Sequence, residues 1–154
     1  MAPWKKKAGS RLGKQPPQYR FFLDPYQDAR FTRCPQCDQP MRQRKLPLVI
    51  HIDPMQLLSL NKTCRYCPHC DLLITHQDDV EHLLASIFTE LRPEIVGNTY
   101  LVVGTLDKTI WKRGTQDPLT IQEMLEALHD FKEAITFQPA GGWRPERAKH
   151  PAQK

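Results

Sequence analysis

The clearest hydrophobic pattern in the chain lies between Val80 and Leu91. Its apolar residues recur at the spacing of one face of an α-helix: Val80, Leu83, Leu84, Ile87, Phe88 and Leu91. Thr75, followed three residues later by Asp78, matches a capping box at the start of this pattern. Pro93 marks its end, because proline cannot continue a helix. The pattern therefore predicts a helix between Thr75 and Pro93.

Two shorter patterns follow. Residues 100–106 and 109–112 are apolar and β-branched runs joined by Asp107-Lys108, which predicts a β-hairpin. Thr120 with Glu123 is a second capping box. It precedes a predicted helix whose buried side carries Ile121, Met124, Leu125, Leu128 and Phe131. Residues 135–137 add a final short strand to the prediction.

Strand patterns and turns dominate the chain before the first helix. Residues 46–52 form a β-rich run that ends at Asp53-Pro54, and residues 63–66 predict another short strand. His51 and Asp53 share one face of the first strand, and an incidental pair explains them better than a catalytic one. Both chain ends, in contrast, have little to bury. Residues 1–20 predict a disordered basic arm and residues 139–154 a flexible tail, in which Trp143 docks back on the body.

The two predicted strands lie between two copies of one local sequence. Cys34-Pro35-Gln36-Cys37-Asp38 and Cys67-Pro68-His69-Cys70-Asp71 share the pattern C-P-x-C-D. Two residues between paired cysteines let both sulfurs face one ion from a single tight turn, and the proline pre-sets the backbone angle. The following aspartate tolerates the positive φ that such a turn can demand. Backbone N–H groups of the turns can donate to the sulfurs and lower the pKa values of the thiols.

These turns resemble the knuckles of the zinc-ribbon and rubredoxin-like class, over about residues 31–75. In that class the four knuckle cysteines hold one metal, which implies one structural Zn²⁺ ion on Cys34, Cys37, Cys67 and Cys70. The chain departs from the class in lacking the glycines that commonly follow the cysteines. It also has a long spacer, 29 residues between Cys37 and Cys67. A redox-active pair or iron is the alternative to zinc.

Cys64 is ambiguous, because Cys64 and Cys67 also have the spacing of a ligand pair. The repeat favours Cys67 with Cys70, since only that turn has the proline and the aspartate. Cys64 is then a small buried apolar residue on the strand that leads into the turn. His69 is expected to point outward from the knuckle.

Together these elements predict a small α+β protein of 154 residues. A zinc ribbon of two or three strands occupies residues 21–75 and packs with a helix–β-hairpin–helix unit over residues 76–138. The chain has no run of about 18 apolar residues that could span a membrane. Its N-terminus also lacks the apolar stretch of a secretory signal. The sequence therefore favours a cytoplasmic protein, in which reduced thiols bind metal instead of forming disulfides.

Charge is distributed unevenly along the chain, within a net charge of +5. Residues 1–33 carry eight Lys or Arg residues against two acids, whereas residues 71–139 carry five against twelve. A basic arm joined to a basic cysteine region is compatible with RNA or DNA as a partner. The candidate nucleic-acid contacts are Lys5, Lys6, Lys7, Arg11, Lys14, Arg42, Arg44, Lys45 and Trp111.

The sequence thus predicts a zinc-binding protein without enzymatic activity that associates with nucleic acid. The alternative is a protein–protein adaptor, in which zinc is purely structural and the acidic region 76–138 meets the partner. An enzyme subunit or a redox protein is a weaker alternative. Four cysteine ligands would close the metal site and leave no position for a substrate, which argues against metal catalysis.

Overall fold

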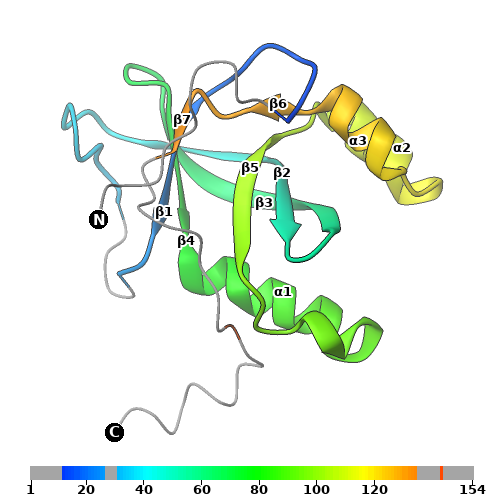
Figure 1. The fold of residues 1–154 in the computed structure, drawn as a ribbon. Helices are drawn as coiled ribbons and strands as arrows, with labels where there is room; N and C mark the ends of the chain where they lie inside the picture. Colours follow the sequence, from blue (N-terminus) through cyan, green and yellow to red (C-terminus); the bar gives the residue numbers. More distant parts are fainter. Residues whose placement is uncertain (1–11, 27–30, 135–142, 144–154) are drawn as a thin grey trace, which may run out of the picture.

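The central element of the fold is a mixed β-sheet that curls into a half-barrel (Figure 1). The structure, a computed structural model, describes residues 12–26, 31–134 and 143. Within these residues the sheet has seven strands: β1 (Arg20–Asp24), β2 (Arg42–Ile52), β3 (Gln56–Cys67), β4 (Leu72–His76), β5 (Tyr100–Thr105), β6 (His129–Asp130) and β7 (Glu133–Ala134). The helices are α1 (Gln77–Leu91), the 3-10 turn η1 (Pro93–Ile95), α2 (Lys108–Gln116) and α3 (Ile121–Ala127).

The strands follow the order β6-β5-β2-β3-β4-β1-β7. A long antiparallel hairpin, β2 with β3, forms the middle, and its register runs from Arg42 opposite Tyr66 to Ile52 opposite Gln56. The two edge strands, β6 and β7, are only two residues apart in the chain. The link between them hydrogen-bonds to both sides, from the Phe131 amide to the Val103 carbonyl and from the Lys132 amide to the Tyr19 carbonyl. One short segment therefore joins the two edges of the curled sheet.

One face of the sheet packs against α1. Alternate residues of β2 point to this face, as the two-residue period of a strand requires: Leu46, Leu48, Ile50 and Ile52. The helix contributes Val80, Leu84 and Phe88, all buried. Phe131 stacks on Phe21 with ring centroids 4.4 Å apart. This cluster is the main core of the molecule, and apolar burial of this kind supplies most of the stabilisation of a fold.

The opposite face holds two smaller apolar clusters. Met124 and Leu128 cover Val49 and Val103 near α3. The second cluster surrounds the cysteine turns and consists of Cys34, Met41, Cys67, Leu72 and Ile74, with Phe22 and Phe31 packed against it. The cysteine region is thus built on the far side of the sheet from α1.

The predicted fold, a ribbon of two or three strands packed with a helix–β-hairpin–helix unit, is wrong. β2 pairs with β5 from Leu48 opposite Thr105 to Ile52 opposite Tyr100, so the ribbon strands and the later strand belong to one sheet. The second half of the predicted hairpin, residues 109–112, lies in α2 instead. The physical reason is that β2 and β6 occupy both edges of β5, which leaves no edge for another strand.

The two predicted helices are present in the structure. The helix over residues 80–91 is confirmed as α1, and it ends before Pro93. Its predicted cap is wrong, because Thr75 lies in β4 and donates its hydroxyl to the Cys64 sulfur. The capping box of Thr120 with Glu123 is confirmed at α3. That helix ends at Ala127, so Leu128 and Phe131 do not belong to it as predicted. Both side chains are nevertheless buried, and they come from the residues that follow the helix.

Part of each predicted flexible end is packed on the body. In the arm, the amides of Lys14 and Gln15 donate to carbonyls of Leu125 and Leu128, and Gln18 donates to Asp130. The segment runs beside β6 at the top of Figure 1. In the tail, Trp143 is 1 % exposed, as its predicted docking requires. The predicted strand over residues 135–137 lies outside the described residues. So do four of the predicted nucleic-acid contacts, Lys5, Lys6, Lys7 and Arg11.

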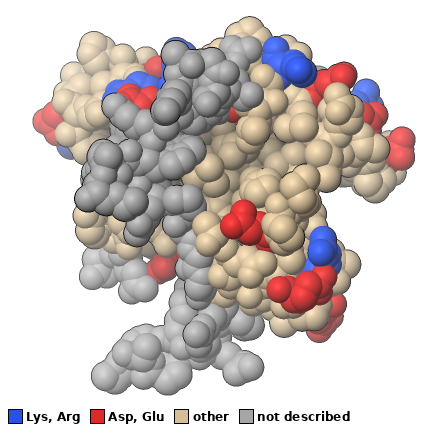
Figure 2. Space-filling view, in the orientation of Figure 1, with Lys and Arg blue, Asp and Glu red and all other residues tan. Residues whose placement is uncertain are grey.

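Charges of both signs are mixed on the face shown in Figure 2. Acidic side chains lie over α1 and over the end that carries α2 and α3, with Lys and Arg among them. No described helix has both the length and the apolar character that crossing a membrane requires.

Candidate metal centre

The first cysteine turn folds back on itself between Arg33 and Pro40, which form an isolated β-bridge. The Cys34 amide donates to the Gln39 carbonyl over 2.8 Å, and the Asp38 amide donates back to the Cys34 carbonyl. Asp38 has a φ of 62°, in the left-handed region. These bonds bring the side chains of Cys34 and Cys37 to the same side of the turn.

The second turn joins β3 to β4. Cys67 is the last residue of β3 and is fully buried, whereas Cys70 lies half-buried in the turn. Asp71 has a φ of 55°, as the equivalent residue of the first turn does. The prediction that aspartate adopts a positive φ after each pair is therefore confirmed, and so is the outward position of His69, which is exposed.

The two turns bring their four sulfurs together. All four Sγ atoms lie within 4.8 Å of one another. Cys34 and Cys70 are 3.9 Å apart, and Cys37 and Cys67 are 3.5 Å apart. A tetrahedral zinc with Zn–S bonds of about 2.3 Å requires sulfurs roughly 3.8 Å apart. The cluster can therefore hold a metal ion, and the four residues present fit the donor set of Zn²⁺.

Two of these sulfurs accept hydrogen bonds from backbone amides of the turns. The Gln36 amide donates to Cys34 Sγ and the Cys70 amide donates to Cys67 Sγ, each over 3.4 Å. Burial raises the pKa of Cys34, but the amide donors of the turn outweigh it, so its pKa is lower than that of an ordinary thiol.

The thiols of Cys37 and Cys70 have raised pKa values. Desolvation and the three neighbouring thiols raise the pKa of Cys70 to about 12. The pKa of Cys37 is also raised: a backbone amide lowers it, but desolvation and neighbouring thiols prevail. Four thiolates this close repel one another, and a divalent cation at their centre offsets that repulsion.

Cys64 lies outside the cluster. It is three residues from Cys67 on the same strand, so the two side chains point to opposite faces of the sheet. Cys64 packs in the main core, whereas Cys67 packs among the apolar residues of the cysteine turns. Burial raises the pKa of the Cys64 thiol to about 11. The expectation that Cys64 is a buried residue on the incoming strand agrees with this position.

Arg20 connects the two turns, a role that sequence reasoning missed. Its backbone amide donates to the Asp71 carbonyl of the second turn over 2.8 Å. Its guanidinium donates to Gln36 in the first turn over 2.6 Å and to Glu133 of β7 over 3.0 Å. No motif marks such a residue, because its three partners are scattered along the chain.

Replacing Arg20 by glutamine should lower the free energy of unfolding by about 1 kcal/mol, because two charge-assisted hydrogen bonds are lost from a half-buried side chain. Urea unfolding of the zinc-loaded protein measures this change. Arg33→Gln is the matched control, since Arg33 pairs with Asp38 in the same region but both side chains are exposed. Equal losses for the two variants would show that Arg20 does not connect the turns.

The predicted nucleic-acid contacts fall in three places among the described residues. Arg42, Arg44 and Lys45 are exposed on β2, at the end of the strand next to the cysteine turns. Lys14 is exposed on the packed segment beside α3. Trp111 is half-buried on α2, and not on the hairpin from which its exposure was predicted.

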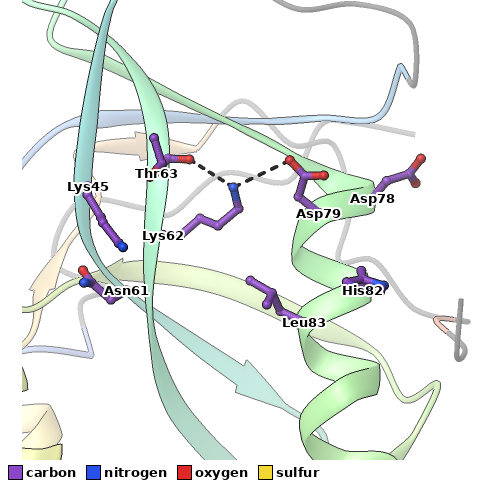
Figure 3. A pocket seen from close by; sticks show the side chains of 8 residues that line it. All are labelled: Lys45, Asn61, Lys62, Thr63, Asp78, Asp79, His82 and Leu83. Carbon is purple, nitrogen blue, oxygen red and sulfur yellow. Dashed lines mark hydrogen bonds and ion pairs between the residues drawn. The ribbon is translucent and has the colours of Figure 1, made fainter.

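A hollow with a volume of about 500 Å³ lies between β3 and α1 (Figure 3). Lys62 reaches across it, donating to the Thr63 carbonyl over 3.1 Å and lying 3.6 Å from Asp79 of α1. The positive charge of Lys62 is therefore offset by the negative charge of Asp79. The predicted pair of His51 with Asp53 is separate, with 3.8 Å between its closest N and O atoms.

No family model matches the chain, and no curated protein or solved structure matches it either. The metal site is therefore supported by the geometry of its four thiols.

Proposed function

We propose that the protein binds one structural zinc ion through Cys34, Cys37, Cys67 and Cys70. The observation that carries this proposal is the mutual approach of the four sulfurs within 4.8 Å. Four thiolate ligands fill a tetrahedral site, so the ion has no open position for a substrate and the centre takes no part in catalysis. The sulfur separations of 3.5 and 3.9 Å are those of ligands around an ion and not of disulfides, whose sulfurs lie about 2.05 Å apart.

The zinc in this proposal holds together the end of the sheet at which the basic strand residues lie. The second turn fixes the junction of β3 and β4, and β3 pairs along its length with β2. Metal binding at such a site contributes directly to folding, because the unfolded chain has no preformed set of ligands.

The function proposed for that end of the sheet is nucleic-acid binding. Arg42, Arg44 and Lys45 are exposed at this end of β2; Arg42 and Arg44 point to one face of the sheet, and Lys45 points to the other together with Arg65, which lies opposite Gln43 on β3. Cations on both faces of this end of the hairpin can contact a phosphate backbone, which is the main source of affinity in nucleic-acid binding. Sequence preference is expected to be slight, since strands bearing only phosphate contacts read no bases.

A variant that changes Arg42, Arg44 and Lys45 to glutamine should weaken binding by about tenfold or more, with a shallower salt dependence. Binding of the zinc-loaded full chain to single-stranded and duplex RNA and DNA is measured by fluorescence anisotropy at about 0.15 M salt. The control changes Arg92, Lys112 and Arg113 to glutamine, an equal loss of charge elsewhere on the molecule. A third protein without residues 1–11 tests whether Lys5, Lys6, Lys7 and Arg11 contribute.

Equal weakening of binding by the two triple variants would show that only the overall charge of the protein matters. It would contradict the proposal that the basic residues of β2 bind the nucleic acid. No binding to any of the four nucleic acids at micromolar protein would instead favour the adaptor. In that case the acidic side chains over α1 and α3 are the surface to test for a protein partner (Figure 2).

A further inference from the structure

A second hollow, which shares Lys45 with the one in Figure 3, lies where β2 passes the first turn of α2. Its volume is about 400 Å³. Arg44 and Lys45 line it from β2, Lys108 lines it from α2, and Tyr19 lines it from the segment before β1. The buried residues Leu46 and Leu106 are also part of its lining. Chain segments far apart in sequence thus converge on one concave site.

The charges of this hollow favour an anion. Three of its lining residues are cations, and Asp107 is the acidic one. The Asp107 carboxylate is largely exposed and lies 3.3 Å from Nε2 of the buried His129. Three cations against one carboxylate give the hollow an excess of positive charge.

Arg44 is held in place before any ligand arrives. Its guanidinium lies over the ring of Tyr66, 4.4 Å from the centroid, and donates to the Tyr19 hydroxyl over 3.1 Å. Tyr66 is fixed in turn, because its hydroxyl donates to Asp71 of the second cysteine turn. Stacking on an aromatic ring leaves the remaining N–H donors of the planar guanidinium available for paired contacts with an oxyanion. A side chain ordered in advance loses little entropy on binding.

We propose that this hollow seats one phosphate group of the bound nucleic acid. The proposal rests on the proposed function and adds to it a defined position on the surface, with Arg44 and Lys108 as the contacts and Lys45 at the border with the hollow of Figure 3. Guanidinium and ammonium donors from two elements suit the several oxygens of a phosphate. Lys108 distinguishes this proposal from the proposed function, because it lies on α2 and is not one of the basic residues of β2.

Lys108→Gln should reduce the slope of log affinity against log salt by about 1, the contribution of one phosphate contact. Lys112→Gln is the matched control, since it removes the same charge from an exposed position of the same helix, outside the hollow. The pair Arg44→Gln and Arg42→Gln makes the same comparison on β2, because Arg44 lines the hollow and Arg42 does not. Each variant is the zinc-loaded full chain, and oligothymidylate is the probe.

Tyr19→Phe tests the positioning of Arg44, because it removes the hydroxyl that accepts from the guanidinium and keeps the ring. We expect weaker oligothymidylate binding with an unchanged melting temperature. Polyglutamate serves as a competitor of similar charge density. It should displace the oligonucleotide poorly if the hollow selects phosphate over carboxylate.

The outcomes separate this inference from the proposed function. Equal salt slopes for Lys108→Gln and Lys112→Gln, with binding still lost in the β2 triple variant, would overturn the phosphate seat and leave the proposed function standing. Equal competition by polyglutamate would overturn phosphate selectivity. If no oligonucleotide binds, inorganic phosphate is titrated and the backbone amides of residues 105–108 are followed by NMR. Shifts there would support the seat and contradict the nucleic-acid function, and their absence would overturn both.

Discussion

Cys67→Ser is expected to remove most of the bound zinc and to lower the free energy of unfolding by about 3 kcal/mol or more. Cys67 is the fully buried member of the cluster, and its sulfur also accepts a hydrogen bond from the Cys70 amide. A hydroxyl there is a poor zinc ligand, so three thiols and a buried hydroxyl would replace a closed site. Metal analysis and thermal unfolding of the same preparation measure both effects.

Cys64→Ser is the control for this experiment. It makes the same chemical change three residues away on β3, at a buried thiol that faces the other side of the sheet. Its zinc content should equal that of the unchanged protein, with a loss of about 1 kcal/mol from placing a hydroxyl in an apolar core. Loss of zinc in the Cys64 variant, with retention in the Cys67 variant, would contradict the ligand assignment.

Gly104→Ala is expected to destabilise the fold by about 3 kcal/mol, because it prevents the close approach of β6 to β5. A Cβ at Gly104 would lie 2.1 Å from the His129 carbonyl oxygen and 2.9 Å from the Asp130 Cα. Both contacts are with backbone, so relief requires β6 to move away. Because β6 and β7 are joined by one short segment, this movement disturbs both edges of the sheet. Urea unfolding measures the loss.

The same substitution at Gly114 is the matched control. Its Cβ would meet the side chain of Leu119, with the nearest atom at 2.9 Å, and a side chain can turn away where a backbone cannot. Alanine also favours the helical backbone of α2 by up to about 1 kcal/mol. Gly114→Ala should therefore be close to neutral. If the two variants lose equal stability, the tight closure of the sheet by β6 is refuted.

Local structure could be predicted from the sequence wherever a few neighbouring residues determine it. The positive φ of Asp38 and Asp71 follows from the geometry of a tight turn between paired cysteines. The capping box at Thr120 needs only a hydroxyl and a glutamate three residues apart. The apolar face of α1 repeats every three or four residues. Each of these patterns depends only on residues that are a few positions apart in the sequence.

The sheet could not be predicted because its pairings join distant segments. β1 pairs in parallel with β4, more than 50 residues later, and with β7, more than 100 residues later. Nothing in the strand patterns specifies which edge another strand takes. For that reason residues 109–112 were expected to pair with residues 100–106, although β2 and β6 occupy both edges of β5.

The same limit applies to the residues that support the two sites. Arg20 contacts both cysteine turns, but its partners Gln36 and Glu133 lie 16 and 113 residues away. Arg44 was selected for its charge alone. The hollow that it lines with Lys108 and Tyr19 depends on three segments that only the folded chain brings together.

X-ray absorption spectroscopy of the purified full chain at the zinc edge identifies the metal and its ligands. A closed structural site should give about one zinc per chain, surrounded by four sulfur atoms at about 2.3 Å and no nitrogen or oxygen ligand. The Cys64→Ser protein should give the same spectrum. Fewer than four sulfurs, iron in place of zinc, or a protein that folds without metal would contradict a closed structural site formed by Cys34, Cys37, Cys67 and Cys70.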